Sequence, residues 1–396
     1  MSFAPTLHLP FELPGRPRLD PVLLTLALCL VFVGMVVLAS ASMSVAEADF
    51  GNAFHYVRRQ MIAVVLGFVA ALGMLLIPIS LWQRLSGLLA LAALMALALL
   101  LVPGVGLTEK GATRWVSLAG VTVQVSDPAR LALILYIAGY LVRRAEDVNE
   151  RFAGFLKPMV VVSIAAALLL AEPDFGAATV LVATTLAMLY VGGARLRDFL
   201  LFGLLALGAL AALAVASPYR LARLTGFLDP WGDPYVGGFQ LTQSLIAIGR
   251  GEWFGVGLGA SVQKLFYLPE AHTDFVFAVF AEEFGLLGSI ALIGLFLALV
   301  LRVFSLARRA AKAQMWFAAY VAVGLGVWFG LQSFINLGVN MGLLPTKGLT
   351  LPLISYGRSS LIMTLVSIGL LLRIHHEVSE PGSLTQRRRR RREAKR

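Results

Sequence analysis

Residues 21–42 read PVLLTLALCLVFVGMVVLASAS, a stretch without a single charged side chain. A helix needs about 20 mostly apolar residues to cross the hydrocarbon core of a bilayer, so this stretch can span a membrane once. The whole chain has the same character, because 59% of its 396 residues are hydrophobic and only 14% are charged. A soluble protein cannot cover that much apolar surface with polar side chains. The sequence therefore predicts a polytopic membrane protein and excludes a soluble enzyme.

Ten stretches share the length and apolar character of a membrane-spanning helix. The predicted fold class is an all-α polytopic membrane protein with about ten transmembrane helices, which form one membrane domain over residues 21–374. Short segments flank this domain at 1–20 and 375–396. The spans are expected at residues 21–42, 60–79, 86–103, 128–142, 157–172, 175–193, 198–217, 275–301, 315–337 and 359–374.

An even number of spans puts both termini on one side of the membrane. Lysine and arginine are enriched in cytoplasmic segments, and cytoplasmic termini place most of the 33 basic residues inside, among them Arg387–Arg392 of the tail. We therefore expect a cytoplasmic N-terminal segment and a basic cytoplasmic tail. The tail is expected either to lie against anionic lipid or to act as a disordered topology anchor. Since the basic residues of these segments account for the net charge of +11, no nucleic-acid partner is expected.

The segment 218–274, between the seventh and eighth spans, is the long extracytoplasmic loop of this topology. It contains many glycines with aromatic residues between them. A loop of this length in a compact protein is usually functional. The loop ends on Asp274, directly before an apolar run that starts at Phe275. Asp274 is therefore either the N-cap of a helix or a reactive carboxylate at the membrane boundary.

Ionisable residues at or inside the spans are costly, so each is a candidate for function. Asp127 and Arg130 stand three residues apart at the start of the fourth span, where a structural ion pair is the alternative. Asp174 lies at the turn between the fifth and sixth spans. Glu282 lies about two turns into the eighth span, where a snorkelling side chain or an interhelical contact is the alternative. We predict that these four residues are charges of an internal cavity.

Basic and hydroxyl residues gather on the predicted outer face. Cations and the free backbone N–H groups at a helix start both suit a phosphate group, although an ordinary capped loop would contain similar residues. The arrangement favours an anionic, phosphorylated, lipid-linked substrate. The predicted substrate-binding residues are Lys110, Arg114, Arg220, Arg223, Lys347, Ser359 and Ser360.

The sequence contains no motif for several other kinds of chemistry. The chain has one cysteine, Cys29, which cannot form an intramolecular disulfide. Its five histidines show no metal-ligand spacing. No phosphate-binding P-loop and no dinucleotide fingerprint is present, so no nucleotide cofactor is expected.

Segments in and beside the long loop resemble the SEDS family, the shape, elongation, division and sporulation glycosyltransferases. The outer-loop signature is LPEAHTDFVFA at Leu268–Ala278. Ser261–Tyr267 and Leu344–Pro352 look like the cell-division branch of the family rather than the elongation branch. The ten expected spans also agree with the family. The further matching segments are Tyr219–Leu224, Phe227–Trp231, Gln240–Ser244 and Gly249–Gly251.

Two positions depart from the family pattern. The family usually has Gly-Gly-Ser-Ser before the last span, whereas this chain has Arg358 at the second position. An arginine is costly there if the backbone needs a positive φ; alternatively, it supplies a phosphate contact. The family's fourth span opens with Pro-x-Glu followed by lysine, whereas Asp127, Pro128 and Arg130 keep the charges with a shorter acid and an arginine.

The resemblance implies a peptidoglycan glycosyltransferase that polymerises lipid II, the undecaprenyl-pyrophosphate-linked disaccharide pentapeptide. By this resemblance the family's catalytic aspartate corresponds to Asp274. Asp274 is then the general base for one inverting attack that forms a β-1,4 link. Cations or a divalent metal ion, Mg²⁺ or Mn²⁺, must absorb the charge of the leaving pyrophosphate. The implied partners are a class B penicillin-binding transpeptidase of division (FtsI-like) and divisome activators. The implied location is the division septum, in the bacterial cytoplasmic (inner) membrane.

Two other functions stay open. A lipid II flippase would use buried charges such as Asp127 and Arg130 along a translocation path, and a non-enzymatic division scaffold would need no reactive site. The outer position of Asp274 and the lack of a recognisable inverted repeat favour the polymerase over the flippase. The long glycine-rich loop argues against a pure scaffold.

Overall fold

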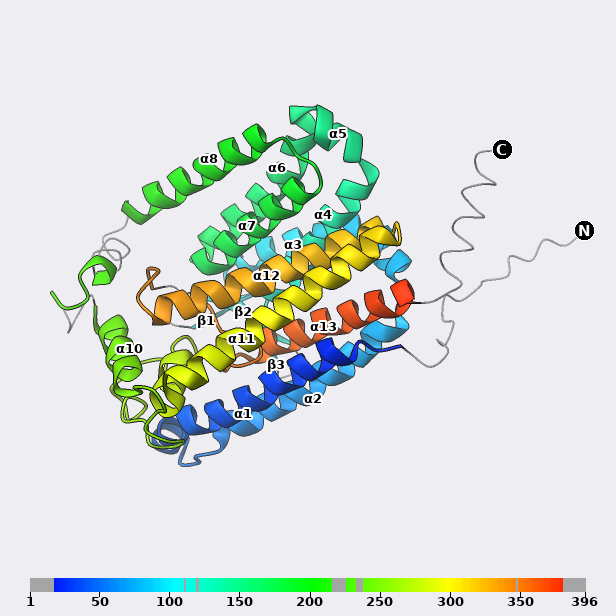
Figure 1. The fold of residues 1–396 in the computed structure, drawn as a ribbon. Helices are drawn as coiled ribbons and strands as arrows, with labels where there is room; N and C mark the ends of the chain where they lie inside the picture. The colour runs from blue at the N-terminus through cyan, green and yellow to red at the C-terminus, as the bar shows by residue number, and fades with distance from the viewer. Residues whose placement is uncertain are drawn as a thin grey trace, which may run out of the picture.

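The computed structural model describes residues 18–109, 112–118, 121–215, 226–232, 238–346 and 348–379. Helices that pack side by side dominate it (Figure 1). An apolar chain folds this way in lipid because each helix satisfies its own backbone N–H and C=O groups. The helices are α1 (Pro21–Phe50), α2 (His55–Leu76), α3 (Ile79–Leu100), α4 (Ser126–Arg143), α5 (Ala145–Glu150), α6 (Phe152–Ala171), α7 (Phe175–Val191), α8 (Leu196–Val215), α10 (Phe239–Arg250), α11 (Val276–Lys312), α12 (Trp316–Asn340) and α13 (Arg358–Ser379).

All ten stretches that were expected to span the membrane are largely helical in the described part of the chain, as α1–α4, α6–α8 and α11–α13. Seven of these helices are long and apolar enough to cross a membrane, namely α1, α2, α3, α6, α11, α12 and α13. α7 is a shorter apolar helix, and α4 contains charged residues near both ends. The polytopic helical fold is therefore confirmed, whereas the number of ten crossings and the sidedness of the termini stay predictions.

Besides α5, two features lie in segments that the sequence analysis treated as plain loops. The first is an antiparallel sheet of three strands, β1 (Leu107–Glu109), β2 (Ala112–Leu118) and β3 (Val121–Gln124), in the order β1-β2-β3. The second is α10, inside the long loop. The alternation of apolar and polar residues in the strands is short, so the long apolar runs on either side conceal it. The sheet places β3 against the start of α13, where Ser359 Oγ donates to the Gln124 carbonyl at 3.4 Å.

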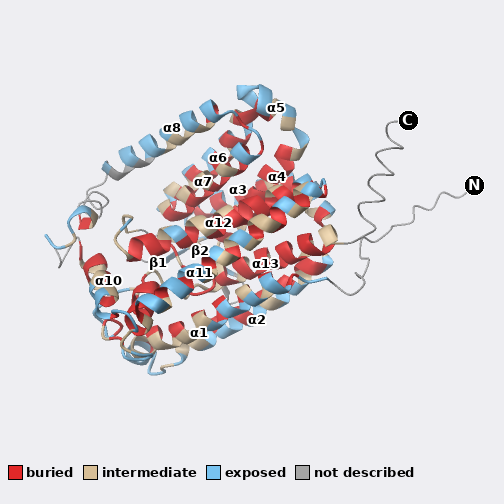
Figure 2. Ribbon diagram, viewed as in Figure 1, coloured by how far each residue is buried: buried red, intermediate tan, exposed pale blue. Residues whose placement is uncertain are grey.

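Burial divides the helices into an inner and an outer set (Figure 2). α12 and α13 are largely buried, and most of α4 is buried as well. α2, α3 and α8 present large apolar side chains outward, for example Val69, Leu88 and Leu204. In a membrane these side chains face lipid, so their exposure costs nothing there. The buried helices α4, α12 and α13 carry several of the polar residues described below.

Candidate functional site

Asp274 lies at the end of the long loop, directly before α11. The helix begins at Val276, and its cap position is Phe275, whose own side chain forms no capping hydrogen bond. Asp274 therefore does not occupy the N-cap position that was the structural alternative for it. Its main-chain carbonyl accepts hydrogen bonds from the side-chain amides of Asn336 (2.9 Å) and Asn340 (3.0 Å). The backbone that carries this carboxylate is thus fixed to α12.

The two asparagines belong to a polar stripe on α12 that the sequence analysis missed. Gln332, Asn336 and Asn340 are spaced four residues apart, so they share one face of the helix. Gln332 Nε2 donates to the Thr350 carbonyl at 2.8 Å, and Asn336 Nδ2 donates to the Leu349 carbonyl at 2.6 Å. The stripe therefore holds both Asp274 and the segment before α13. Three amide side chains at helical spacing inside an apolar span were the signal that could have revealed it.

The segment 348–357, which leads into α13, faces the carboxylate. A Cβ atom built on Gly348 would lie 3.0 Å from Asp274 Oδ2. On the other side of the segment, Gln60 of α2 donates to the Ser355 carbonyl at 3.2 Å. The main chain around Gly348 therefore forms one wall beside the Asp274 carboxylate.

This close approach gives a first prediction. Replacing Gly348 with alanine should reduce the glycan polymerisation that the sequence resemblance implies by about 3- to 10-fold, because the new methyl group displaces the Asp274 carboxylate by a few tenths of an ångström. Rates of lipid II polymerisation by the purified variant would measure the loss. Gly87→Ala is the matched control, because a Cβ there would meet no atom within 4 Å. Equal rates for the two alanine variants would contradict the proposed contact.

Aromatic rings surround the loop beside Asp274. The ring of His272 lies 4.6 Å from that of Tyr56 and 5.9 Å from that of Tyr356, measured between centroids. Tyr56 and Tyr356 make an edge contact at 5.0 Å. The Tyr356 amide also donates to the His272 carbonyl at 2.9 Å. The loop, the start of α2 and the segment before α13 therefore meet in one place next to the carboxylate.

A second polar cluster lies where β3, α4, α7 and α13 meet. Asp127 is 4% exposed and lies within electrostatic reach of Arg130, Asp174 and Ser359. Asp174 is the N-cap of α7, since its Oδ1 accepts from the Ala177 amide at 3.0 Å. The structure thus brings together three of the four predicted cavity charges. It also gives Asp174 a capping role that the sequence analysis did not assign.

Arg130 joins this second cluster to the stripe on α12. Its Nη1 donates to Gln332 Oε1 at 2.9 Å, and its guanidinium lies 5.0 Å from the ring centroid of Trp328. Trp328 Nε1 donates to the same Gln332 oxygen at 2.6 Å. A planar guanidinium can stack on the Trp328 ring and donate a hydrogen bond to Gln332 at the same time, whereas an ammonium has no flat face to stack. The arginine that departs from the family's lysine therefore fits its surroundings.

Glu282, the fourth predicted cavity charge, lies elsewhere. It is fully buried in α11 and forms an ion pair of 3.0 Å with Arg250, at the end of α10. It belongs to the base of the long loop and not to the cluster around Asp127. The structure thus gives Glu282 the interhelical contact that was the alternative to a cavity charge, and this contact joins α10 to α11.

Of the predicted substrate-binding residues, the structure describes three. Arg114 donates through Nε to the Glu172 carbonyl at 3.1 Å and through Nη2 to the Pro173 carbonyl, so it fastens β2 to the turn between α6 and α7. Ser359 contacts β3, and Ser360 Oγ lies 3.3 Å from Thr350 Oγ1. The other predicted residues, Lys110, Arg220, Arg223 and Lys347, lie outside the described residues.

Arg358, the departure from the family's glycine, is the first residue of α13. It is not among the described residues with a positive φ. The position therefore does not need the conformational freedom of glycine. Its Nη2 donates to Thr122 Oγ1 of β3 at 2.5 Å, so the arginine fastens the sheet to α13.

Glu172, in the turn after α6, is a buried carboxyl group that the sequence analysis did not assign to the site. It is 2% exposed, and within the described part of the chain neither of its carboxyl oxygens has a hydrogen-bond partner. Burial, together with the nearby charge of Asp174, raises its pKa from 4.5 to about 8. Between these two pH values the folded protein keeps a proton that the unfolded chain has released. Stability should therefore fall as the pH rises through this range.

The variant Glu172→Gln tests this pH dependence. Glutamine keeps the size and removes the titration, so the variant should lose less stability than the wild-type protein between pH 6 and about pH 8, by several degrees in Tm. Thermal unfolding in detergent at a series of pH values would measure it. Glu146→Gln, which replaces an exposed residue of α5, is the control and should leave the pH profile unchanged. Parallel profiles for wild type and Glu172→Gln would refute the raised pKa.

The fold and the site define a class of protein: a multi-pass membrane protein whose polar groups gather on buried helices beside a carboxylate at the base of a long loop. The family model described as "Cell cycle protein", for FtsW, RodA and SpoVE, matches residues 20–380. The chain belongs to this family, which confirms the resemblance drawn from its sequence motifs.

Curated relatives match nearly the whole chain. A "Probable peptidoglycan glycosyltransferase FtsW" of Thioalkalivibrio sulfidiphilus is 55% identical over 93% of this chain and 92% of its own length. The protein of the same name from Nitrosococcus halophilus is 52% identical over 93% of this chain and 95% of its own. These likenesses agree with the cell-division branch that the motifs favoured.

Solved structures share the fold. One, described as "Structural coordination of polymerization and crosslinking by a peptidoglycan synthase complex", matches with a TM-score of 0.75 and 32% identity over 92% of this chain and 99% of the matched chain. The rod shape determining protein RodA of Thermus thermophilus matches with a TM-score of 0.69 and 30% identity, over 93% of this chain and all of its own.

Proposed function

We propose that this protein is a peptidoglycan glycosyltransferase of cell division that polymerises lipid II, with Asp274 as the general base. The observation that carries the proposal is the placement of Asp274. Two amides of α12 fix its backbone, and its carboxylate faces the main chain at Gly348. The names of the curated FtsW relatives and the synthase complex of similar fold support the same activity.

The reaction needs one carboxylate that can accept a proton. The acceptor hydroxyl attacks the anomeric carbon of the donor sugar, and its proton passes to Asp274 as the new bond forms. The bond from that carbon to the pyrophosphate breaks, and the lipid pyrophosphate leaves. Pyrophosphate is a good leaving group, so no second carboxylic acid is required. A single displacement inverts the α-linked donor to the β-1,4-linked product.

The leaving pyrophosphate needs positive charge and hydrogen-bond donors. Lys110, Arg114, Arg220, Arg223 and Lys347 are the proposed cations. Ser359 and Ser360 lie at the start of α13, where the first backbone N–H groups of a helix also favour an anion.

A divalent cation, Mg²⁺ or Mn²⁺, belongs to the proposal only as a companion of the substrate. The part of the chain that the structure describes contains no group of three or more His, Cys, Asp or Glu residues that could hold a metal ion. Magnesium is often held mainly by substrate phosphates. No step of the proposed reaction is assigned to it.

An apolar groove beside the site suits the lipid part of the substrate. A hollow of about 460 Å³ runs along the first turns of α2 and is lined almost entirely by apolar atoms. Tyr56, in the same turns, contacts His272 of the loop that carries Asp274. A polyprenyl chain in this groove would leave its pyrophosphate near the loop. The lining residues are Phe54, Val57, Arg58, Met61, Ile62, Val65 and Leu66.

The cellular setting follows from the same proposal. We place the protein in the bacterial cytoplasmic membrane at the division septum, with both termini in the cytoplasm. Its partners are a class B penicillin-binding transpeptidase of division, which cross-links the new strands, and divisome activators. The solved synthase complex, which couples polymerization and crosslinking, supports the first of these partners.

Two assays on the purified protein separate this proposal from its alternatives. Supplied with lipid II in detergent, alone and with the transpeptidase partner, the wild-type protein should produce glycan strands that a gel resolves. Reconstituted in vesicles, a flippase would instead move lipid II between leaflets without forming strands. Activity in neither assay would leave the division scaffold as the function.

A further inference from the structure

The long loop is fastened to α11 at a break in that helix. Gly285 has φ 66° and ψ −164°, so the helical hydrogen-bond ladder stops there. A Cβ atom on Gly285 would lie 2.4 Å from the amide nitrogen of Gly255, in the loop. A Cβ atom on Gly255 would lie 2.1 Å from the Glu283 carbonyl. The loop and the broken helix therefore touch backbone to backbone, and only glycine fits at these two positions.

The loop satisfies the backbone groups that the break releases. Carbonyls before the break accept from loop amides, and amides after the break donate to loop carbonyls. Inside a membrane protein such groups must find partners, so the loop and the break stabilise each other. The four bonds are Val256 N to Glu282 O (3.0 Å), Gly257 N to Glu283 O (3.1 Å), Leu286 N to Glu252 O (2.8 Å) and Leu287 N to Trp253 O (3.2 Å).

Two adjacent carboxylates strengthen this attachment. Glu282, fully buried, accepts from Ser261 Oγ at 2.5 Å and from Arg250 Nη1 at 3.0 Å. Glu283, 1% exposed, accepts from Lys264 Nζ at 2.8 Å and from Ser40 Oγ of α1 at 2.6 Å. Each carboxylate thus binds one cation and one hydroxyl, and Glu282 also accepts from the Val262 amide at 3.1 Å and from the Gln263 amide at 3.4 Å. We call these six residues the loop latch: Ser40, Arg250, Ser261, Lys264, Glu282 and Glu283.

The latch is close in sequence to Asp274, and the chain between them is tightly held. The Leu268 amide donates to the Gln263 carbonyl at 2.9 Å, and the Phe275 amide donates to the Glu270 carbonyl at 3.1 Å. Leu268 is 3% exposed and Ala271 2%. Hydrogen bonds and two buried side chains therefore hold the part of this segment from Leu268 to Asp274 in place.

We infer that the loop latch positions Asp274 for catalysis, with Glu282 and Glu283 as positioning residues that act through the loop and do not touch the substrate. The inference rests on the proposed function. The amides of Asn336 and Asn340 hold Asp274 from the α12 side, whereas the latch holds the preceding loop from the α1 and α11 side. Removing the latch leaves one of these two supports, so the carboxylate can move relative to the acceptor hydroxyl.

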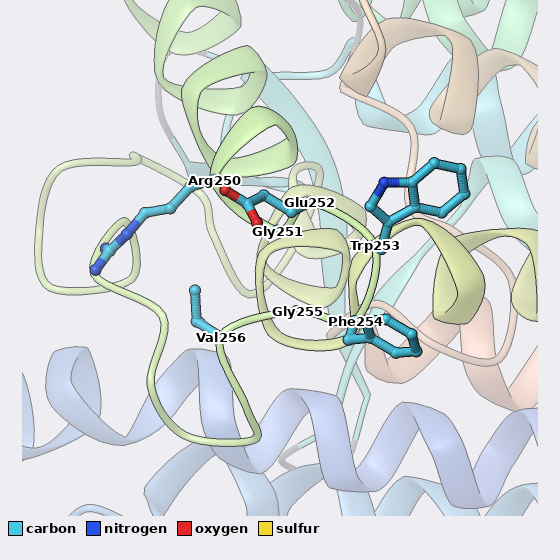
Figure 3. A pocket seen from close by; sticks show the side chains of 7 residues that line it. All are labelled: Arg250, Gly251, Glu252, Trp253, Phe254, Gly255 and Val256. Carbon is cyan, nitrogen blue, oxygen red and sulfur yellow. The ribbon is translucent and has the colours of Figure 1, made fainter.

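The two halves of the latch should contribute unequally. The Lys264 side chain is 8% exposed, whereas that of Arg250 is 45% exposed. Arg250 lines a hollow of about 410 Å³, and Figure 3 shows its side chain pointing away from Trp253 and Phe254 of the same loop. Water and salt weaken an exposed ion pair more than a buried one. Neutralising Lys264 should therefore cost more activity than neutralising Arg250.

The experiment compares Glu283→Gln and Lys264→Met with the conservative variant Lys264→Arg. Below their unfolding temperatures, the first two should lower kcat of lipid II polymerisation by about 10- to 100-fold and leave KM within about twofold, because a small misplacement of a catalytic group costs that much in rate. Lys264→Arg, which keeps the charge, should retain most of the rate, and Arg250→Gln should lose less than Lys264→Met. Hydrogen exchange at the amides of Val256 and Gly257 should become faster in the two neutralised variants.

The matched control removes a similar ion pair from the other end of α11. Arg302 Nη2 and Asp20 Oδ1 form a pair of 2.8 Å, in which the Asp20 side chain is fully buried. Arg302→Gln should lower thermal stability as the latch variants do and leave kcat near the wild-type value. Wild-type kcat in the latch variants, or an equal loss in Arg302→Gln, would overturn the inference. A wild-type protein that makes no glycan strands would instead reject the proposed function, while the exchange rates would still report on the latch.

Discussion

Asp274→Asn is expected to abolish glycan polymerisation, with a loss of at least about 100-fold in rate, because asparagine cannot accept the proton of the attacking hydroxyl. The fold should be unaffected. The bonds that hold this residue to Asn336 and Asn340 use its main-chain carbonyl, which the substitution keeps. Strand formation from lipid II, measured alongside the unfolding temperature in detergent, is the test.

The control for Asp274→Asn removes another carboxylate at the same end of the bundle. Asp49 is exposed near the end of α1, so Asp49→Asn should polymerise lipid II at the wild-type rate. Wild-type strand synthesis by Asp274→Asn would show that another group removes the proton. A loss of activity together with a collapse of the unfolding temperature would show that Asp274 is needed for the fold rather than for the reaction.

Asn340→Leu should have the second-largest effect. The Asn340 side chain is fully buried, and its Nδ2 donates to the carbonyls of Asp274 (3.0 Å) and Asn336 (2.9 Å). Its Oδ1 accepts from the Ala278 amide at 3.1 Å. Leucine has a similar size and can make none of these bonds, so it leaves buried polar groups unpaired at a cost of about 1–3 kcal/mol each.

The expected result is a loss of both rate and stability. We expect kcat to fall by about 10- to 100-fold, because the backbone of Asp274 loses one of its two supports on α12. The KM for lipid II should stay near the wild-type value, since Asn340 is not exposed to substrate. Steady-state kinetics at temperatures below unfolding would separate the two quantities.

Ser333→Ala is the matched control for Asn340→Leu. Ser333 lies on the same helix and is 3% exposed, and its hydroxyl has no hydrogen-bond partner in the structure. Its replacement should leave both rate and stability close to wild type. If Asn340→Leu behaves like Ser333→Ala, the stripe on α12 does not support Asp274.

The sequence predicted the helices because their signal is local. A run such as residues 21–42 contains within itself both the apolar character and the length that a membrane-spanning helix needs. The general base, too, was assigned from a local motif, through the resemblance of Leu268–Ala278 to the family. Neither conclusion required knowledge of which helices lie next to each other.

The contacts that support Asp274 are of another kind. Asn340 lies 66 residues from Asp274 along the chain, and Ser40 lies 243 residues from Glu283. From the sequence alone, Glu282 was assigned to the cavity with Asp127, because buried charges look alike until their neighbours are known. No residue of α12 was assigned a function, although three amides stand on one of its faces.

By itself, then, the sequence determined that this is a polytopic helical membrane protein of the SEDS type and which carboxylate to examine. Only the tertiary structure decided that α12 and the break in α11 hold that carboxylate from two sides. The physical reason is that burial in lipid depends on each segment's own composition, whereas a hydrogen bond or ion pair between distant residues exists only once packing has brought them together.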